Sequence, residues 1–280
     1  MSLLTDFISA YPAQPATAYW RTVEIGALAE AGLPEGRGLD LGCGDGKLTS
    51  IVLGLTGPRT LVGVDPDPLE IENAKRFSFY QALHTAPGNA IPEPSESFDF
   101  VISNSVLEHI PELDGIMAEV FRLLRPGGRF IFTVPSPGFH QNLKGAAAPW
   151  TSRKAYLEQL DRRLAHFHYL SSDDWAALCG RHGLRVDRCR GYLGRAETQR
   201  WETLSRMTGG LLYAVGGGRL RPIEIQRRIG ARQLQNRAGL PVGVARALGD
   251  VISVGAPVDG ADPWRPETVA SCLLVEGVRP

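Results

Sequence analysis

The stretch RGLDLGCGDG, residues 37–46, decides the fold. Its first part is a short apolar run that ends in glycine, and a helical pattern follows over residues 45–55. A glycine-rich turn between a buried strand and a helix is typical of the edge at which open α/β sheets bind their ligands. We therefore expect a ligand site at this turn.

Strands and helices alternate along the first half of the chain and return near its end. The predicted helices cover 45–55, 67–80 and 112–124, and a further helix is capped by Ser171-Ser172-Asp173-Asp174 and runs to about His182. The predicted strands are 37–42, 60–65, 83–86, 98–103, 129–134, 184–193 and 267–278. This alternation predicts an α/β fold, Rossmann-like, with a mostly parallel seven-stranded sheet and helices on both faces.

The glycine loop does not have the dinucleotide pattern G-x-G-x-x-G, because the sixth position counted from Gly42 is Lys47. Asp65 ends the next strand, 19 residues after Gly46, where a carboxylate can accept hydrogen bonds from ribose hydroxyls. Asp40 and Asp45 beside the loop would repel a pyrophosphate. They suit a cationic ligand such as S-adenosylmethionine, which has an ammonium and a sulfonium.

Four ordered blocks resemble the motifs of class I S-adenosylmethionine-dependent methyltransferases, and the likeness is closest to their type 11 group. LDLGCGDG resembles the first motif and GVDPDPLEIENAK the second. The stretch IPEPSESFDFVISNSVLEHIPELDGIMAEVFRLLRPGGRFIFTVPSP is similar to the blocks that follow. The resemblance is dense over 36–137 and implies S-adenosyl-L-methionine as cofactor, with S-adenosyl-L-homocysteine as its product.

The resemblance also implies roles for individual residues. The methionine part of the cofactor would be lined by Asp40, Gly42, Gly44 and Gly46. Asp65 would hold the ribose and Pro66 would lie near the adenine, while Ser103 and Asn104 would face the methyl donor.

Two positions near the predicted cofactor site depart from the family or stay open. Where the family has an acid that binds the adenine amine, this chain has Pro87, so the backbone of Asn89 or Ala90 would have to replace it. Arg21, in AYWRTVEIGAL, could pair with the cofactor carboxylate. The alternative for Arg21 is a solvated side chain on a packed helix.

Methylation of an alcohol needs a base to remove the hydroxyl proton. The candidates are His109 in VLEHIP, His140 past the fifth strand, and His168 in RLAHFHYLSSDDW. Period-2 spacing would put His166 and His168 on one face, and Tyr169 is a further candidate. Asp173-Asp174 is an acid pair that could bind a metal, but a helix cap explains it better, so no metal ligand is predicted.

The chain divides by charge as well as by motif. It has 30 Lys+Arg and 30 Asp+Glu, but residues 195–246 hold ten Arg against three Glu, a difference of +7. We expect an N-terminal cap segment at 1–35, a core at 36–193 and 266–280, and a helical insertion at 194–265 that is an acceptor lid or an oligomer contact. Segment 195–246 could also contact a membrane surface or mediate a homodimer, or be a solvated helical cap.

The composition and the resemblance together predict a cytoplasmic enzyme with a small-molecule acceptor. Zero net charge disfavours a general nucleic-acid binder, and the sequence shows no transmembrane segment and no disulfide scaffold. The expected acceptor is a hydroxyl oxygen of a sugar, glycolipid precursor or secondary metabolite. The alternatives are a C-methyltransferase of a polyketide or isoprenoid, a non-catalytic S-adenosylmethionine-binding partner protein, and an RNA methyltransferase.

Overall fold

The computed structural model describes residues 2–12, 14–210, 240–254, 258 and 262–280. Its centre is one sheet with the strand order β3-β2-β1-β4-β5-β8-β6-β7. The strands are β1 (Arg37–Leu41), β2 (Thr60–Asp65), β3 (Tyr80–Thr85), β4 (Phe98–Asn104), β5 (Leu124–Pro135), β6 (Arg185–Tyr192), β7 (Trp264–Arg265) and β8 (Cys272–Val278).

The sheet confirms the predicted mostly parallel Rossmann-like fold. Strands β1 to β5 pair in parallel, and β8 runs antiparallel between β5 and β6. The seven predicted strands are present, and the structure adds an eighth. This extra strand, β7, is only two residues long and pairs with the end of β6 at Gly191 and Tyr192. It lies at the end of the predicted insertion, too short for a periodic signal.

Helices cover both faces of the sheet, as predicted. One face packs against α3 (Lys47–Thr56) and α4 (Pro68–Ala74), and the other packs against α5 (Asp114–Leu123) and α8 (Ser172–Arg181). Ser171 caps α8 in a capping box with Asp174, which confirms the predicted helix cap. Among the described residues, no helix is both long enough and apolar enough to span a bilayer.

Three predicted boundaries differ because aromatic packing and strand pairing override local signals. Helix α4 ends at Ala74 instead of residue 80, since Phe77, Phe79 and Tyr80 pack on one another with ring centroids 5.2 and 4.5 Å apart. Strand β3 accordingly begins at Tyr80 instead of residue 83. Strand β5 begins at Leu124, before the proline and glycines predicted as a turn, because Leu124 pairs with Phe98 of β4. A fourth boundary, the start of the closing strand, is Cys272 instead of residue 267, because residues 266–270 form a turn on the Pro266 carbonyl.

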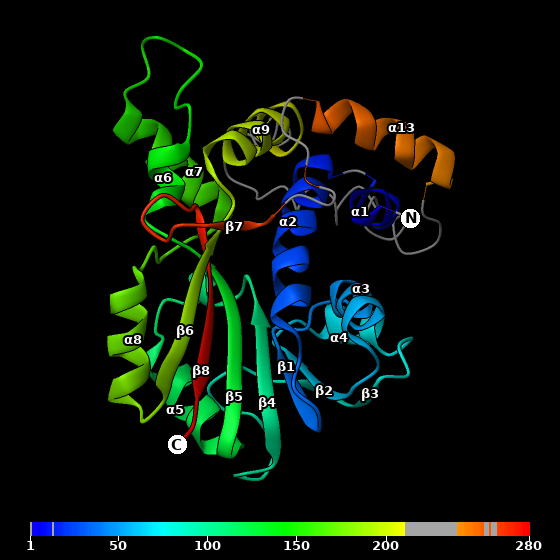
Figure 1. Cartoon of the computed structure of the whole chain (residues 1–280), viewed down its shortest axis with the longest axis vertical. Helices are drawn as coiled ribbons and strands as arrows, with labels where there is room; N and C mark the ends of the chain where they lie inside the picture. Colours follow the sequence, from blue (N-terminus) through cyan, green and yellow to red (C-terminus); the bar gives the residue numbers. More distant parts are fainter. Residues whose placement is uncertain (1, 13, 211–239, 255–257, 259–261) are drawn as a thin grey trace.

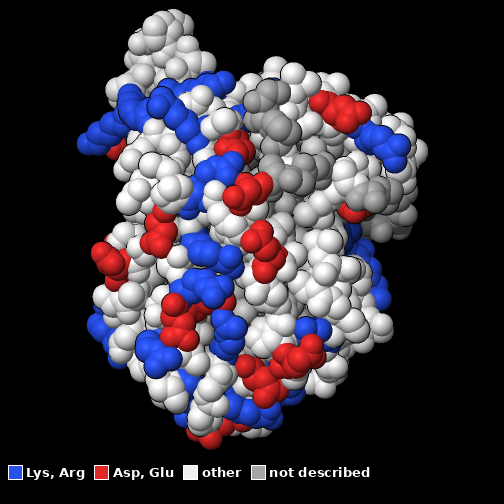
Figure 2. All heavy atoms as spheres, in the orientation of Figure 1, with Lys and Arg blue, Asp and Glu red and all other residues white. Residues whose placement is uncertain are grey.

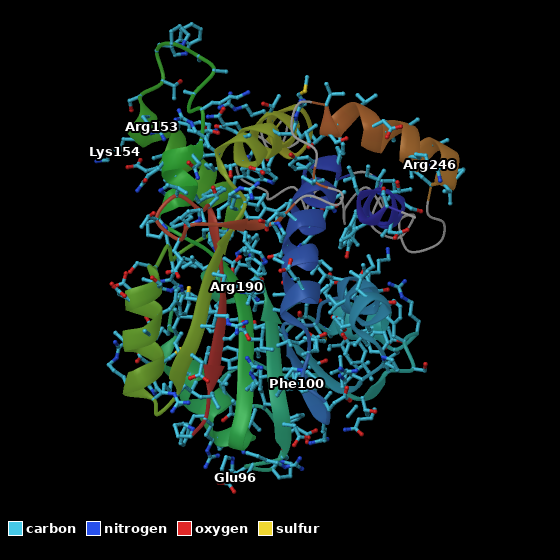
Figure 3. The ribbon with its side chains drawn as sticks, viewed as in Figure 1. Glu96, Phe100, Arg153, Lys154, Arg190 and Arg246 are labelled. Carbon is cyan, nitrogen blue, oxygen red and sulfur yellow. The ribbon has the colours of Figure 1, made fainter. Side chains whose placement is uncertain are left out.

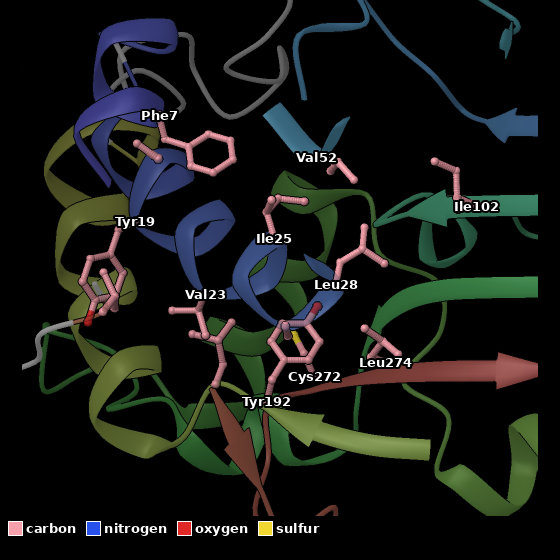
Figure 4. Packing of buried hydrophobic residues seen from close by; sticks show 14 of the residues in the cluster. Phe7, Tyr19, Val23, Ile25, Leu28, Val52, Ile102, Tyr192, Cys272 and Leu274 are labelled. Atoms are coloured by element: carbon pink, nitrogen blue, oxygen red, sulfur yellow. The ribbon is translucent and has the colours of Figure 1, made fainter. Parts of the chain in front are cut away.

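The N-terminal helices pack against the end of the sheet and against the insertion. Helix α1 (Leu3–Ala10) contacts α13 (Val242–Ser253), and α2 (Pro15–Ala31) contacts α9 (Arg195–Ser205), which continues into the π-helical turn η2 (Arg206–Gly210). Figure 1 shows α1, α9 and α13 at the same end of the molecule, with α2 running down from them along the sheet. Figure 4 shows Val23 and Leu28 of α2 in the same buried cluster as Tyr192, Cys272 and Leu274 of the sheet.

Charged side chains of both signs share the face over β6. Blue and red atoms alternate down this face in Figure 2. Glu276 of β8 is buried and lies within ion-pair distance of Arg129, Arg188 and Arg190, and Figure 3 places Arg190 at the middle of the face. Arg153 and Lys154 lie at the opposite end of the molecule from Glu96 (Figure 3).

The arginine-rich stretch predicted over 195–246 is described only at its two ends. Of its ten arginines, those at positions 219, 221, 227, 228, 232 and 237 lie outside the described residues. Arg206 pairs with Glu202 within the segment, and this Glu is one of the three already counted in the difference of +7.

Candidate functional site

The glycine loop forms the turn between β1 and α3, as predicted. Gly42, Gly44 and Gly46 all have positive φ angles, of 79°, 52° and 75°. A Cβ on Gly42 would lie 2.4 Å from Val106, so packing requires that glycine. A Cβ on Gly44 would meet nothing within 4 Å, so this part of the loop faces open space where a ligand backbone contact can form.

Asp65 joins the ends of the first two strands. One carboxylate oxygen accepts a hydrogen bond from the Gly44 backbone N–H at 3.0 Å, and the other accepts from the Asp67 N–H at 2.9 Å. Burial raises the pKa of Asp65. The carboxylate is thereby fixed at the carboxyl edge of β2, next to the exposed Pro66, where the resemblance placed the ribose and the adenine.

Asp40 lies under the loop. It is only 4% exposed, and one of its oxygens accepts hydrogen bonds from the Thr49 hydroxyl at 2.6 Å and the Tyr80 hydroxyl at 2.5 Å. Burial raises the pKa of Asp40 to about 6. Its contacts brace the loop from beneath, and a role toward the methionine part of the cofactor stays a prediction.

The loop after β3 carries the residues predicted to replace the missing adenine acid. Asn89 and Ala90 are both exposed. The Ala90 backbone N–H, however, already donates to the Pro87 carbonyl at 3.1 Å. Asn89 is therefore the better placed of the two for an adenine contact, which remains a prediction.

Ser103 and Asn104 at the end of β4 have partners within the protein. The buried Ser103 hydroxyl donates to the Leu41 carbonyl at 3.1 Å, which joins β4 to β1. The Asn104 amide nitrogen donates to Glu24 at 3.4 Å, and its Oδ1 lies 2.7 Å from the Thr133 hydroxyl, whose single proton it shares with Glu24. Asn104 thus leads from the cofactor edge to a buried network that the sequence did not reveal.

Glu24 of α2 is the centre of that network. Its carboxylate is fully buried and accepts hydrogen bonds from Ser105 at 2.5 Å, Thr133 at 2.9 Å and Tyr192 at 3.0 Å. Arg21, three residues earlier, pairs with the same carboxylate. The signal available in the sequence was the i, i+3 spacing of Arg21 and Glu24.

Arg21 is mostly buried and forms an ion pair within the protein, so the alternative of a solvated side chain does not hold. The pKa of Arg21 lies above its ordinary value. Burial alone would lower it, but the ion pair and hydrogen bond with Glu24, with the charges of Tyr11 and Glu108, have the larger combined effect. One guanidinium nitrogen is used by Glu24. A further contact of Arg21 with the cofactor carboxylate stays a prediction.

Two of the three predicted base histidines come together, and a third histidine joins them. His140 Nε2 lies 2.9 Å from an oxygen of Asp161, which also accepts from the Tyr169 hydroxyl at 2.6 Å. His166 Nδ1 lies 3.0 Å from that hydroxyl, and the rings of His109 and His166 are 5.1 Å apart. Burial lowers the pKa of His166 to about 3, so its imidazole is neutral.

His168 lies outside this group. Its Nε2 is 2.9 Å from the Ile110 carbonyl and 3.1 Å from the Pro111 carbonyl, so this nitrogen carries a proton and holds the loop after η1 (Leu107–His109). The segment around His166 is not a strand. For that reason the period-2 expectation of a shared face with His168 does not apply. A role of His168 as base stays a prediction, without a contact that supports it.

Aromatic rings form a wall beside the histidines. Phe139 of α6 (Gly138–Asn142) stacks on Tyr169 at 5.7 Å and meets Trp20 of α2 and Trp201 of α9 edge-on at 5.7 and 5.4 Å. The N-terminal segment and the insertion therefore both contribute a tryptophan.

A buried acid lies near the histidines. Glu108 in η1 is 2% exposed, and burial raises its pKa to about 8.

Comparison with known proteins identifies the family. A family model described as a methyltransferase domain, Methyltransf_23, matches residues 18–188. The chain belongs to this methyltransferase family. The prediction of a class I S-adenosylmethionine-dependent methyltransferase is thereby confirmed, and the match includes most of α2 with Arg21 and Glu24.

Two curated relatives and one solved structure show the extent of the likeness. The methyltransferase is 32% identical over 158 residues to an uncharacterized methyltransferase of Schizosaccharomyces pombe, covering 53% of this chain and 59% of that protein. It is 32% identical over 113 residues to a fatty-acid O-methyltransferase of Mycolicibacterium smegmatis, covering 40% and 41%. It thus spans about half the length of these relatives.

The solved structure shows the fold alone. A chain of a Haloferax volcanii complex between the Trm112 methyltransferase activator and a methyltransferase aligns with a TM-score of 0.55 at 16% identity, over 99% of this chain and 97% of that one.

S-adenosylmethionine is the cofactor of this family, and the residues of the methyltransferase fit it. Gly44 leaves open space at the turn, and Asp65 presents a fixed carboxylate at the neighbouring strand end. Both are features that a ribose and an amino-acid moiety require. When bound, the cofactor supplies a methyl group on a positively charged sulfur.

Proposed function

We propose that this methyltransferase transfers a methyl group to a hydroxyl oxygen of a small molecule such as a sugar, a glycolipid precursor or a secondary metabolite. The supporting observation is the His140–Asp161 pair beside the aromatic wall. A carboxylate that accepts from one imidazole nitrogen fixes the tautomer and leaves the other nitrogen basic.

In this proposal each residue has a defined task. Asp161 accepts the Nε2–H of His140, and the hydroxyl of Tyr169 holds the same carboxylate oxygen in place. His140 Nδ1 removes the acceptor proton, and Asp161 then stabilises the imidazolium. Asp65 and the glycine loop bind the ribose and methionine ends, while Trp20, Phe139 and Trp201 exclude water from the acceptor.

The test measures S-adenosylhomocysteine formation with a panel of hydroxylated acceptors, including a hydroxy fatty acid, a sugar and a phenol. We expect His140→Gln to lower kcat at least about 100-fold on the accepted substrate and to leave S-adenosylhomocysteine affinity unchanged. His182→Gln, which removes an imidazole paired with Asp114 on the surface, is the matched control. Equal turnover of both variants would exclude His140 as the base.

C-methylation is a second candidate, and the aromatic wall is the observation that favours it. Three rings around Phe139 could stabilise a carbocation through their π faces, as methylation of an isoprenoid double bond requires. Product analysis separates the two, since the transferred methyl carbon is bonded to oxygen in one product and to carbon in the other, which its ¹³C chemical shift reports. A protein that binds the cofactor without turnover on any acceptor would be the non-catalytic binding partner.

We also propose that the insertion, residues 194–265, is the acceptor lid, because its Trp201 contacts both Trp20 and Phe139. Trp201→Ala should then raise KM for the acceptor and leave cofactor affinity unchanged. The exposed apolar side chains of α13, Val244, Leu248 and Val251, support the alternative of a membrane or homodimer contact. Sedimentation and vesicle binding with Leu248→Glu test that alternative.

A further inference from the structure

Three side chains with metal-ligating atoms converge between η1 and the segment after α7 (Arg153–Leu164). One ligand atom each of Glu108, His109 and His166 lies within 4.8 Å of the other two. The backbone holds them together, because the Phe167 N–H donates to the Glu108 carbonyl at 2.8 Å. Two imidazoles and one carboxylate are a ligand set that borderline divalent metals favour.

The hydrogen bond of His109 defines its tautomer. Its Nδ1 lies 3.0 Å from the Ala165 carbonyl oxygen, which can only accept, so Nδ1 carries the proton. Nε2 therefore presents a lone pair, and this atom lies 4.0 Å from an oxygen of Glu108. The carbonyl orients the ring in the way that outer partners orient metal-binding histidines.

His166 has the same tautomer for a related reason. The single proton of the Tyr169 hydroxyl is donated to Asp161 at 2.6 Å. The hydroxyl oxygen must then accept from His166 Nδ1–H at 3.0 Å, which leaves Nε2 of His166 with its lone pair. Each histidine thus donates from one nitrogen to an outer partner and carries a lone pair on the other.

Glu108 supplies the independent observation that something belongs at this point. It is 2% exposed, and its Oε2 has no hydrogen-bond partner among the residues that the structure describes. An unpaired carboxyl oxygen in the protein interior costs free energy whether or not the group is protonated, unless a cation or a hydrogen-bond partner compensates it. Arg21, whose charge acts on Glu108, is already paired with Glu24.

We propose that Glu108, His109 and His166 bind one divalent transition-metal ion of the zinc class. The three atoms, which now lie within 4.8 Å of one another, would have to approach to roughly 3.4 Å, the ligand spacing of a tetrahedral site. Magnesium and calcium fit less well, since they prefer oxygen ligands throughout. Three protein ligands leave at least one coordination position open, and an acceptor hydroxyl bound there would have a lowered pKa. That catalytic use rests on the proposed function, whereas the metal site itself does not.

The test is a titration of tag-free, chelator-treated full-length protein with ZnCl2 by calorimetry and with CoCl2 by visible absorption. We expect one ion per chain, and an affinity at least about 100-fold lower in Glu108→Gln and in His166→Gln. His182→Gln removes a surface imidazole and should bind as the parent protein does. Circular dichroism checks folding, and if Glu108→Gln does not fold, His166→Gln alone decides.

The result that would overturn the site is parent-like affinity in His166→Gln, or no stoichiometric binding by the parent protein. Neither the cofactor nor an acceptor is present in the titration. A negative titration therefore leaves proposed methyl transfer through His140 standing, and absence of methyl transfer leaves a positive titration standing.

Discussion

The glycine loop and the Glu24 network meet at one edge of the sheet but are built in opposite ways. The loop is local: Gly44 and the carboxylate that holds it, Asp65, are 21 residues apart. The network is distributed: Glu24 accepts from Ser105, Thr133 and Tyr192, which are 81, 109 and 168 residues away. The glycine loop can therefore be recognised from a sequence motif, whereas the Glu24 network becomes apparent only in the folded structure.

The largest expected effect lies in the distributed half. Glu24→Ala leaves the buried donors of Ser105, Thr133 and Tyr192 and the guanidinium of Arg21 without their acceptor. We expect a loss of about 3–5 kcal/mol in the free energy of unfolding, measured by urea denaturation. The control is Glu35→Ala, whose carboxylate is 87% exposed beside Arg59 and should contribute about 0.5 kcal/mol or less. Equal losses would mean that the network is not the anchor of α2.

The next effect concerns the support beneath the loop and depends on pH. Because burial raises the pKa of Asp40 to about 6, the folded state binds this proton more tightly than the unfolded chain does. The resulting stabilisation is complete below pH 4 and is lost as pH rises through 6. Asp40→Asn keeps an acceptor for Thr49 and Tyr80, so its stability relative to the parent should rise by the order of 3 kcal/mol between pH 4 and 7. A constant difference across this range would contradict the assignment.

A smaller effect separates ligand binding from stability at the loop. Asp65→Asn removes the charge that would hold the ribose, and we expect S-adenosylhomocysteine to bind about 10–100-fold more weakly by calorimetry. Asp67→Asn makes the same change two residues away, at an N-cap where asparagine serves equally well. Its affinity should stay within about twofold of the parent value. Similar weakening in both variants would indicate a general charge effect at the loop.

The smallest expected effect compares two glycines of similar backbone. Gly44 and Gly127 both have positive φ, and an added Cβ would meet nothing within 4 Å at either position. Alanine should therefore cost about 1 kcal/mol of stability at each. Only Gly44→Ala should also weaken S-adenosylhomocysteine binding, because Gly127 lies at the start of β5. If Gly44→Ala binds normally, the open side of the loop is not the ligand side.

The sequence predicted the fold and the cofactor edge well because both depend on local patterns. Strand periodicity and the glycine turn placed β1, β2 and β4 within one residue of their observed bounds. Helix α4 was predicted too long, since three aromatic rings pack together after its seventh residue. The two-residue β7 exists only through its pairing with β6 and leaves no signal of its own.

The acceptor side was harder to predict because its geometry is set by long-range partners. Spacing could not separate His166 from His168, whose hydrogen bonds go to Tyr169 and to the carbonyls of the loop after η1. The contact of His168 joins segments 58 residues apart, so no local pattern shows it. The Arg21–Glu24 and His166–Tyr169 pairs are three residues apart, but their spacing alone does not distinguish them from solvent-exposed neighbours.

The contact between Trp20 and Trp201 gives the protein an intrinsic optical reporter. Their rings lie 5.3 Å apart, one on the N-terminal segment and one on the insertion. In the proposed function the acceptor enters beside Phe139, where its binding would alter the environment of both indoles at once. Occupancy of the acceptor side can thus be followed by fluorescence of the unlabelled protein, before the identity of the methylated product is known.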